Sequence, residues 1–306
     1  MGRFINPFTD VGFKRIFGQS VHKDLLIDFL NNLLAGEKQV KDISFLDKEL
    51  LPEFQGDRGA IYDIYCTTES GEEFIVEMQN CEQAYIRERA VYYLCRAMSR
   101  QGERGANWKF NLKAVYGIFF LNFEMKDSGG KFRTDVLLSD RESHVLFSDK
   151  LRFVFLQLPC FKKEESECEN DFERWIYVLK NMETLQRLPF KARKSVFEKL
   201  EQIVDIASLS KEERMKYDES IKVYRDQLAT LDFAEQKGEA KGFVRGHAQG
   251  LTEGRAKGRE EGREEGRAEG RAEGMLDVAR RMKAMSIPVE TISLATGLSL
   301  EEIAGL

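Results

Sequence analysis

Asp63, Glu77 and Gln79 are polar residues inside an apolar segment that has the pattern of a β-hairpin. Residues 59–68 and 72–80 alternate in polarity as strands do and are joined by a Glu-Ser-Gly-Glu turn. If Thr67 pairs with Glu73, then Asp63 lies opposite Glu77, with Cβ atoms roughly 4.5–5.5 Å apart. A shift of one residue in this register would send one carboxylate to the other face of the sheet.

Two carboxylates at that separation can share one hard cation such as Mg²⁺, which takes one or two carboxylates together with waters and phosphate oxygens. A cation held there would polarise a phosphodiester and activate a water. Gln79 shares the face of Glu77 and could orient water or phosphate, but an amide is neither a base nor a cation. The alternative from spacing alone is a solvent-facing hairpin with ordinary acidic residues.

Basic residues flank this hairpin on two predicted helices. Asp10 and Lys14 are one turn apart, as in a surface ion pair or as an outer metal ligand beside a phosphate clamp. The helix predicted over 82–103 carries a basic face that suits DNA backbone phosphates, although a solvated basic face has the same pattern. The residues of that face are Arg89, Arg96 and Arg100, with Tyr92, Tyr93 and Gln101 nearby.

The surrounding pattern predicts a mixed α/β core of about 160 residues. Two helices are expected within 8–36, the first capped by Asn6-Pro7 or Thr9 and the second by Ser20. Besides the hairpin, strands are expected at 43–47, 113–123, 143–148 and 151–158. Three amphipathic helices should follow, near 168–186, near 191–207 and from Ser210, where Glu213 completes a capping box.

Residues 238–274 contain ten glycines at every fourth position, among charged residues of both signs. Each glycine costs about 0.8–1 kcal/mol relative to alanine in a helix, so an isolated helix is doubtful. One interpretation is a dimer arm, in which two helices approach closely along the glycine stripe with Arg–Glu pairs across the seam. The other is a charged low-complexity spacer with partial helicity.

Residues 275–306 return to ordinary composition and predict three short helices. The first is MLDVARRMKAM, the second begins near Pro288, and the last is capped by Ser299 and Glu302 after a turn at Gly297. The outline is that of a helix-turn-helix. The last helix is short and acidic, however, which disfavours a role in reading DNA.

The composition limits the classes of function. With 47 Lys+Arg, 52 Asp+Glu and a net charge of −5 in 306 residues, the chain is not a polycation that coats nucleic acid or membranes. Five cysteines without CxxC spacing indicate reduced thiols. No long apolar run or signal-peptide pattern is present. We therefore expect a cytoplasmic protein with no membrane partner.

Several segments, in order and spacing, resemble the Rpn family of bacterial proteins, known as recombination-promoting nucleases or PD-(D/E)XK nuclease family transposases. The resemblance covers nearly the whole chain. It is carried by NPFTDVGFKRIFG, IYDIYC, FIVEMQN, YIRERAVYYLCRAMSRQGERG, LKAVYGIFFLNF, SDKLRFVFLQLPCF, RWIYVLKNMETL, DESIKVYRDQL and the Gly-x-x-x-Gly tract.

This resemblance implies a restriction-endonuclease-like PD-(D/E)XK core and Mg²⁺-dependent (or other divalent cation-dependent) cleavage of DNA, in recombination or in defence against foreign DNA. The family's Asp and Glu-x-Gln positions fall on Asp63, Glu77 and Gln79. Asp63, Glu77 and the Met78 carbonyl would hold the metal, with Asp10 as a further candidate ligand. Gln79 departs from the lysine of many superfamily members. The implied DNA contacts are Lys14, Arg89, Tyr93, Arg96, Arg100 and Gln101.

We therefore predict a nuclease core (1–162), a helical extension (163–236), the glycine repeat (237–274) and a small helical C-terminal unit (275–306). The leading hypothesis is a metal-dependent DNA endonuclease that forms a homo-oligomer through its tail. The alternative is a catalytically weak DNA-binding or regulatory subunit that acts through that tail.

Overall fold

The structure is a computed structural model that describes residues 2–50, 59–102, 109–190 and 194–306. The chain forms two compact units, Met1–Gln227 and Leu228–Leu306. The finer division at residues 162, 236 and 274 stays a prediction. No helix in the described ranges is both long and apolar enough to span a lipid bilayer.

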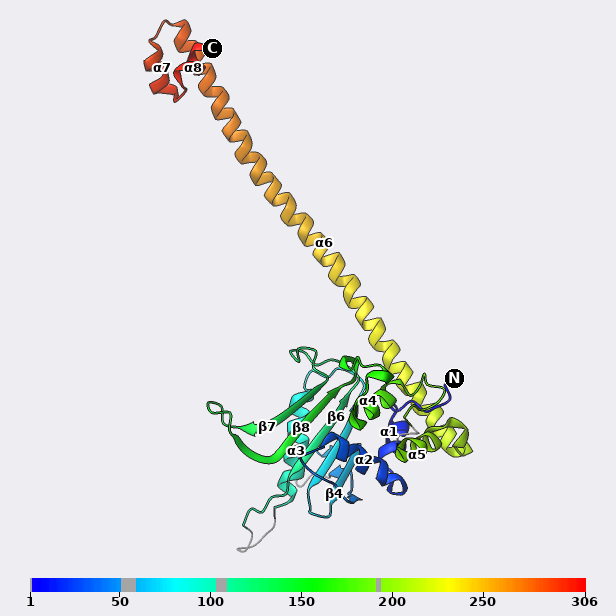
Figure 1. Cartoon of the computed structure of the whole chain (residues 1–306). Coiled ribbons are helices and arrows are strands. Elements are labelled where there is room, and N and C mark those ends of the chain that lie inside the picture. The colour runs from blue at the N-terminus through cyan, green and yellow to red at the C-terminus, as the bar shows by residue number, and fades with distance from the viewer. Residues whose placement is uncertain (1, 51–58, 103–108, 191–193) are drawn as a thin grey trace. The chain divides into compact units, whose positions relative to one another are not determined.

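The first unit is built on a six-stranded mixed sheet with the strand order β1-β4-β5-β6-β8-β7 (Figure 1). The adjacent strands β5, β6 and β8 are parallel, and the other neighbours in the sheet pair antiparallel. The bounds are β1 Ile43–Phe45, β4 Ile64–Thr68, β5 Glu73–Gln79, β6 Val115–Leu121, β7 Arg133–Ser139 and β8 Leu146–Gln157. A mixed sheet with helices on both faces confirms the predicted α/β class.

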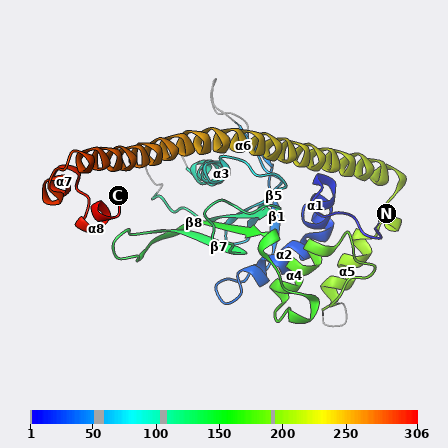
Figure 2. The ribbon, with the colours of Figure 1, turned by 90° about the horizontal axis from the view of Figure 1, so that it is seen from above.

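Helices cover the two faces of this sheet unequally (Figure 2). One face carries α1 (Asp10–Phe17), α2 (Lys23–Leu33), α4 (Asp171–Asn181), α5 (Ser195–Val204) and the first turns of α6 (Lys211–Ala284). Its aromatic core includes Phe29, Phe120 and Trp175. The other face is covered by α3 (Ile86–Arg100). The hairpin strand β5 therefore lies between two packed layers.

Gly117 lets α3 lie close to the sheet. A Cβ atom at this position on β6 would lie 2.5 Å from Leu94 Cδ1 of α3 and 2.7 Å from the Phe119 ring. Leu94 is fully buried at this contact. Close packing here fixes the height of α3 above β5, and so fixes the side chains that α3 directs toward Glu77.

The strand predictions were partly wrong. The predicted strand 59–68 is broken at Tyr62–Asp63, because β3 (Ala60–Ile61) pairs with β2 (Glu49–Leu50) and the Tyr62 N–H donates to the Lys48 carbonyl. Of the two strands predicted at 143–148 and 151–158, residues 146–148 and 151–157 belong to one strand, β8, and residues 143–145 lie before it. The partner strand β7 was not predicted. The register of Thr67 with Glu73 is confirmed.

The cap predictions fared better. Thr9 caps α1 by accepting from the Gly12 N–H at 3.0 Å. The Ser210–Glu213 capping box forms, with contacts of 2.8 and 3.2 Å. Ser20 does not cap α2, which begins at Lys23 after a 3₁₀ turn over Ser20–His22.

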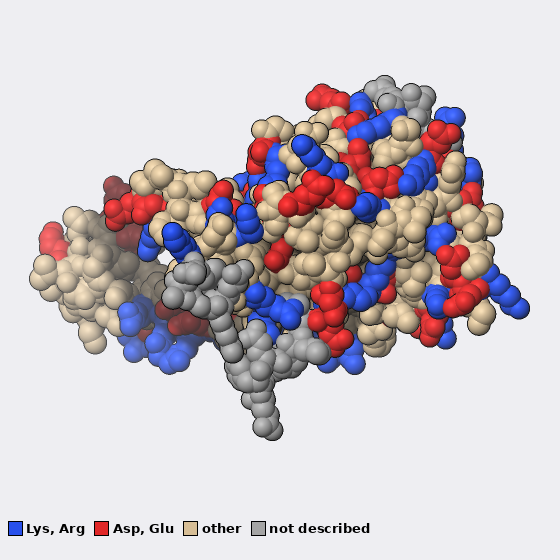
Figure 3. Space-filling view, turned by 90° about the horizontal axis from the view of Figure 1, so that it is seen from below, with Lys and Arg blue, Asp and Glu red and all other residues tan. Residues whose placement is uncertain are grey.

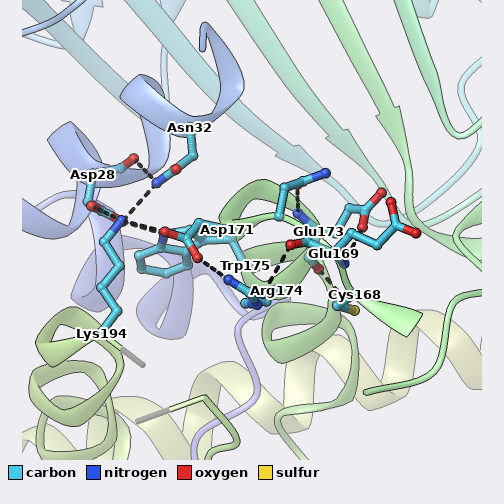
Figure 4. A network of polar contacts seen from close by, with 10 residues as sticks. Asp28, Asn32, Cys168, Glu169, Asp171, Glu173, Arg174, Trp175 and Lys194 are labelled. Atoms are coloured by element: carbon cyan, nitrogen blue, oxygen red, sulfur yellow. Dashed lines mark hydrogen bonds and ion pairs between the residues drawn. The ribbon is translucent and has the colours of Figure 1, made fainter. Parts of the chain in front are cut away.

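A polar network fastens α4 and the segment before α5 to α2 (Figure 4). Asp28 of α2 accepts from Trp175 Nε1 at 2.8 Å and pairs with Lys194 Nζ at 2.6 Å. Lys194 also pairs with Asp171, whose other carboxylate oxygen accepts from Arg174. Burial of the Trp175 ring thus comes with a satisfied indole N–H.

In the second unit α6 runs without a break through the glycine tract. The doubt about a helix there was wrong: the residues between the glycines are chiefly Ala, Glu, Arg and Lys, which favour helix. Pairs such as Lys257–Glu261 add i,i+4 support. Ala279 of α6 packs on Ile292 of α7 (Val289–Thr296) and Ile303 of α8 (Leu300–Ala304), and the Ser299–Glu302 capping box forms as predicted.

Candidate active site

Asp63 and Glu77 are joined by two hydrogen bonds that cross between their backbone segments. The Asp63 N–H donates to Glu77 Oε1 at 3.0 Å, and the Met78 N–H donates to Asp63 Oδ2 at 2.9 Å. Asp63 directly precedes β4, whose register with β5 pairs Ile64 with Val76. Because the predicted strand is broken here, the Asp63 carboxylate accepts the Met78 N–H in place of a backbone carbonyl of the neighbouring strand.

Glu77 is buried, and Asp63 is half-buried. Glu77 is 1% exposed, so the solvent-facing hairpin considered above is wrong for this residue. Burial, followed by the charge of Asp63, raises the pKa of Glu77 to about 8. Burial also raises the pKa of Asp63. A buried acidic pair of this kind is costly to ionise without a cation beside it.

The backbone of β5 adds a carbonyl to this cluster. The odd-numbered residues of β5 direct their backbone N–H and carbonyl groups toward β6, as the hydrogen bonds of Glu73 and Gln79 show. The backbone N–H and carbonyl of Met78 therefore face β4, which agrees with the hydrogen bond that its N–H donates to Asp63. Its carbonyl points to the same side, so it can join the two carboxylates as an oxygen ligand.

Gln79 and Arg89 complete the surroundings of Glu77. Gln79 Nε2 donates to Glu77 Oε2 at 3.2 Å, and Arg89 Nη2 lies 3.6 Å from the same oxygen. Gln83 links these two side chains: it donates to Gln79 Oε1 at 3.1 Å and accepts from Arg89 Nη1 at 3.0 Å. The Arg89 guanidinium also lies over the Tyr93 ring, 4.9 Å from its centre.

A groove of about 600 Å³ opens beside Asp63. Asp10 and Lys14 line it together with Asp63. Their roles as an outer ligand and a phosphate clamp stay predictions. Lys14 is paired with Asp10 at present. Lys14 lowers the pKa of Asp63 and Asp10 raises it, although both effects are smaller than that of burial.

The remaining predicted DNA contacts lie farther along α3. Arg96 is near Tyr62, and Arg100 is near Tyr65 and Glu73. Gln101 accepts from the Lys113 N–H at 2.7 Å and lies 3.4 Å from Glu73 Oε1. Glu73 is four residues before Glu77 on β5, roughly 13 Å away along the strand. The structure therefore gathers Arg89 and Tyr93 at the carboxylate pair and places Gln101 at the other end of the strand.

Sequence reasoning missed Gln83 and Tyr85. Both share a pocket of about 660 Å³ with Arg89, Tyr92 and Tyr93. Tyr85 is one helical turn before Arg89, a spacing that could have been noticed. Gln83 precedes α3, and its contact with Gln79 depends on how the chain turns between β5 and α3.

The donor set is one that Mg²⁺ accepts. In the described ranges, no cluster of three or more His, Cys, Asp or Glu side chains could hold a metal ion. Two carboxylates and a carbonyl are oxygen ligands, and Mg²⁺ characteristically completes its shell with waters and substrate phosphates. The residues present therefore fit a hard divalent cation that is bound jointly with substrate.

A mixed sheet whose hairpin presents Asp and then Glu-x-Gln defines the chain as a PD-(D/E)XK-type nuclease fold. Residues 7–234 match the family described as PD-(D/E)XK nuclease family transposase, and the chain belongs to this family. The match ends before the glycine tract. Searches of the curated proteins and of the solved structures gave no match.

Proposed function

We propose that this protein is a Mg²⁺-dependent DNA endonuclease that hydrolyses phosphodiester bonds at the Asp63–Glu77 site. The observation that carries the proposal is the pair of a buried Glu77 and a half-buried Asp63, whose backbone segments are linked by reciprocal hydrogen bonds. Structural acidic residues are rarely buried without a matched cation. An arrangement that costs folding energy in this way is characteristic of functional sites.

Asp63, Glu77 and the Met78 carbonyl would hold the cation, and Asp10 lies along the same groove as a candidate outer ligand. When bound, the cation would polarise the scissile phosphate and lower the pKa of a water. Glu77 and Asp63 are already oriented by their hydrogen bonds to backbone, so little side-chain freedom would be lost on binding.

Gln79 and Arg89 would together take the roles of the lysine found in many members of the superfamily. Gln79 is positioned to orient a water or a phosphate oxygen through its amide. Arg89 brings a permanent positive charge to within 3.6 Å of Glu77 from a different element, α3. A guanidinium also binds phosphate in a bidentate manner, so it can offset the charge that develops in the transition state.

DNA would be held by cations on both sides of the site. Lys14 lines the groove beside Asp63, and Arg96 and Arg100 continue along α3. Figure 3 shows that Lys and Arg are interspersed with Asp and Glu on the face it displays. Local contacts from these cations would hold the strand. A role in recombination or in defence against foreign DNA is what the family suggests.

Plasmid nicking tests this proposal. Wild-type protein should convert supercoiled plasmid to the open-circular form with Mg²⁺ and not with EDTA, and Glu77→Ala should reduce the rate at least 100-fold. Glu82→Ala is a matched control, because Glu82 is an exposed acidic residue just after β5 that pairs with Lys126. Equal nicking by wild type and Glu77→Ala would reject this site as the catalytic centre.

We further infer that the tail mediates self-association. Ten exposed glycines recur at every fourth position of α6. Apart from the adjacent residues and the nearby backbone of the same helix, no atom of the described residues lies within 4 Å of where their Cβ atoms would be. Two such helices could approach closely with their mixed charges paired across the seam.

A further inference from the structure

The pocket at the start of α3 is lined by aromatic rings and is separate from the groove beside Asp63. Tyr85, Tyr92 and Tyr93 line it together with Gln83, Glu88 and Arg89, and it encloses about 660 Å³. The three tyrosines offer polarisable ring faces around one opening, and the rings of Tyr92 and Tyr93 are tilted by 50° with centroids 6.4 Å apart. Such a surface recognises planar rings by stacking.

The Tyr85 ring is largely open to solvent, and the Tyr92 ring is partly open. Tyr85 is 74% exposed and Tyr92 is 36% exposed, and both are on the same side of α3 as Arg89. An apolar ring surface left in water forgoes about 25 cal/mol for each Å² that burial would gain. Tyr85 directly precedes α3, and its carbonyl accepts the hydrogen bond of the Arg89 N–H at 2.9 Å in the first turn. Its ring lies outside the core.

Arg89 connects this pocket to the carboxylate pair. Its guanidinium reaches Glu77 Oε2 at 3.6 Å on one side and Gln83 Oε1 at 3.0 Å on the other, and it lies over the Tyr93 ring. A phosphate held by Arg89 near Glu77 would place the attached nucleoside next to the tyrosines. The amide of Gln83 and the carboxylate of Glu88 offer polar atoms for the edge of a base.

On these grounds, and building on the proposed endonuclease function, we propose that the tyrosine pocket takes an unstacked nucleobase next to the scissile phosphate. The preferred substrate would then be single-stranded or locally opened DNA. Bases in an intact duplex have both faces covered by their neighbours, so they cannot stack on Tyr85 or Tyr92 unless they leave the helix.

Binding measured without cleavage tests this inference. The probe is a fluorescein-labelled 20-nucleotide single strand, compared with its blunt duplex, and Kd is measured by anisotropy in EDTA. Wild type should bind the single strand more tightly than the duplex. Tyr85→Ala and Tyr92→Ala should each weaken binding of the single strand by about 5- to 150-fold, as expected for loss of one stacked base. Tyr85→Phe should bind as wild type does, and duplex binding should change less than twofold.

Phe147→Ala is the matched control, since Phe147 is an aromatic residue that is 81% exposed and lies on β8 rather than α3. It should leave both affinities unchanged. Equal affinity for single strand and duplex, or an unchanged single-strand Kd in Tyr85→Ala, would overturn the inference. A further outcome is that dAMP quenches tyrosine fluorescence in wild type but not in Tyr85→Ala, while the oligonucleotide Kd is the same in both. This result would instead assign the pocket to a free nucleotide. Because all readouts are binding in EDTA, they are independent of whether Glu77 supports cleavage.

Discussion

The Asp63 N–H donates to Glu77 Oε1 while the carboxylate of Asp63 accepts from the residue that follows Glu77. Each acidic residue is thus held by the backbone segment of the other. This reciprocal arrangement fixes the buried carboxyl group of Glu77 and the half-buried one of Asp63 side by side at one end of the β4–β5 hairpin. The consequences are thermodynamic as well as chemical, since the folded protein must tolerate the pair when no cation is bound.

The stability of the cation-free protein should fall as pH rises. Burial raises the pKa of Glu77 to about 8. Below about pH 4.5 the folded and unfolded chains both carry the proton. Between pH 4.5 and 8 only the folded chain keeps it, so unfolding becomes easier as pH rises. Denaturant unfolding in EDTA should show a loss on the order of 3 kcal/mol between pH 5 and pH 8.

Glu77→Gln should abolish most of this slope, because an amide keeps the shape and does not ionise. Glu82→Gln should keep the slope of wild type. An equal change in stability from pH 5 to pH 8 in wild type and in Glu77→Gln would contradict the predicted protonation of Glu77.

Divalent cations should stabilise the folded protein, and more so at pH 8 than at pH 6. Cation binding requires ionised carboxylates, so protons compete for the site. At a concentration of 100 times Kd, binding to the folded state alone adds about 2.7 kcal/mol, which corresponds to several degrees in Tm. Thermal melts with Mg²⁺ or Ca²⁺ should show this shift in wild type. The same shift in Asp63→Asn would show that the cation binds elsewhere.

Arg89 should matter more for the rate of cleavage than for DNA affinity. Arg89→Ala removes the guanidinium 3.6 Å from Glu77, and loss of one charge of this kind costs about 10²–10³ in rate. Adding Gln79→Lys to Arg89→Ala should restore part of the rate, because a lysine there would return a cation to the site. Failure of this second substitution to recover any activity would argue that Arg89 acts by another route. Single-turnover nicking rates are the measurement.

Asp28 should contribute more to stability than its neighbour Asp24 on the same helix. Asp28→Ala leaves the buried indole N–H of Trp175 without its partner and breaks the pair with Lys194, at a cost of about 1–3 kcal/mol. Asp24→Ala removes only an exposed pair with Lys199, worth at most about 1 kcal/mol. Urea midpoints compare the two, and equal losses would count against the network in Figure 4.

The glycine stripe should be required for self-association. Light scattering should give the full chain the mass of an oligomer and give a chain ending at residue 227 the mass of its monomer. Replacing Gly254, Gly258 and Gly262 by alanine should raise helix content while it weakens association, because added methyl groups separate the two backbones. An unchanged number of protomers per particle after truncation would favour a charged spacer. Unchanged association with increased helicity would reject close contact along the stripe.

The sequence determined the hairpin and its register. Alternating polarity in β5 and the turn residues before it set Thr67 against Glu73, and this alone placed Asp63 opposite Glu77. Local capping chemistry at Thr9, Ser210 and Ser299 was likewise readable, because each cap involves residues only three apart. These features rest on contacts between close neighbours in the chain, or on one strand and its hairpin partner.

Only the tertiary structure decided how buried the pair is and what surrounds it. Whether Glu77 meets water depends on α3, whose distance from the sheet is set by Leu94 against Gly117. The position of Arg89 beside Glu77 and the presence of the tyrosine pocket follow from the same packing. The break before β4 also escaped prediction, since the Tyr62 N–H bonds to the carbonyl of Lys48, which directly precedes β2. Periodicity assigns a side chain to a face, but the element that covers that face is chosen by long-range packing.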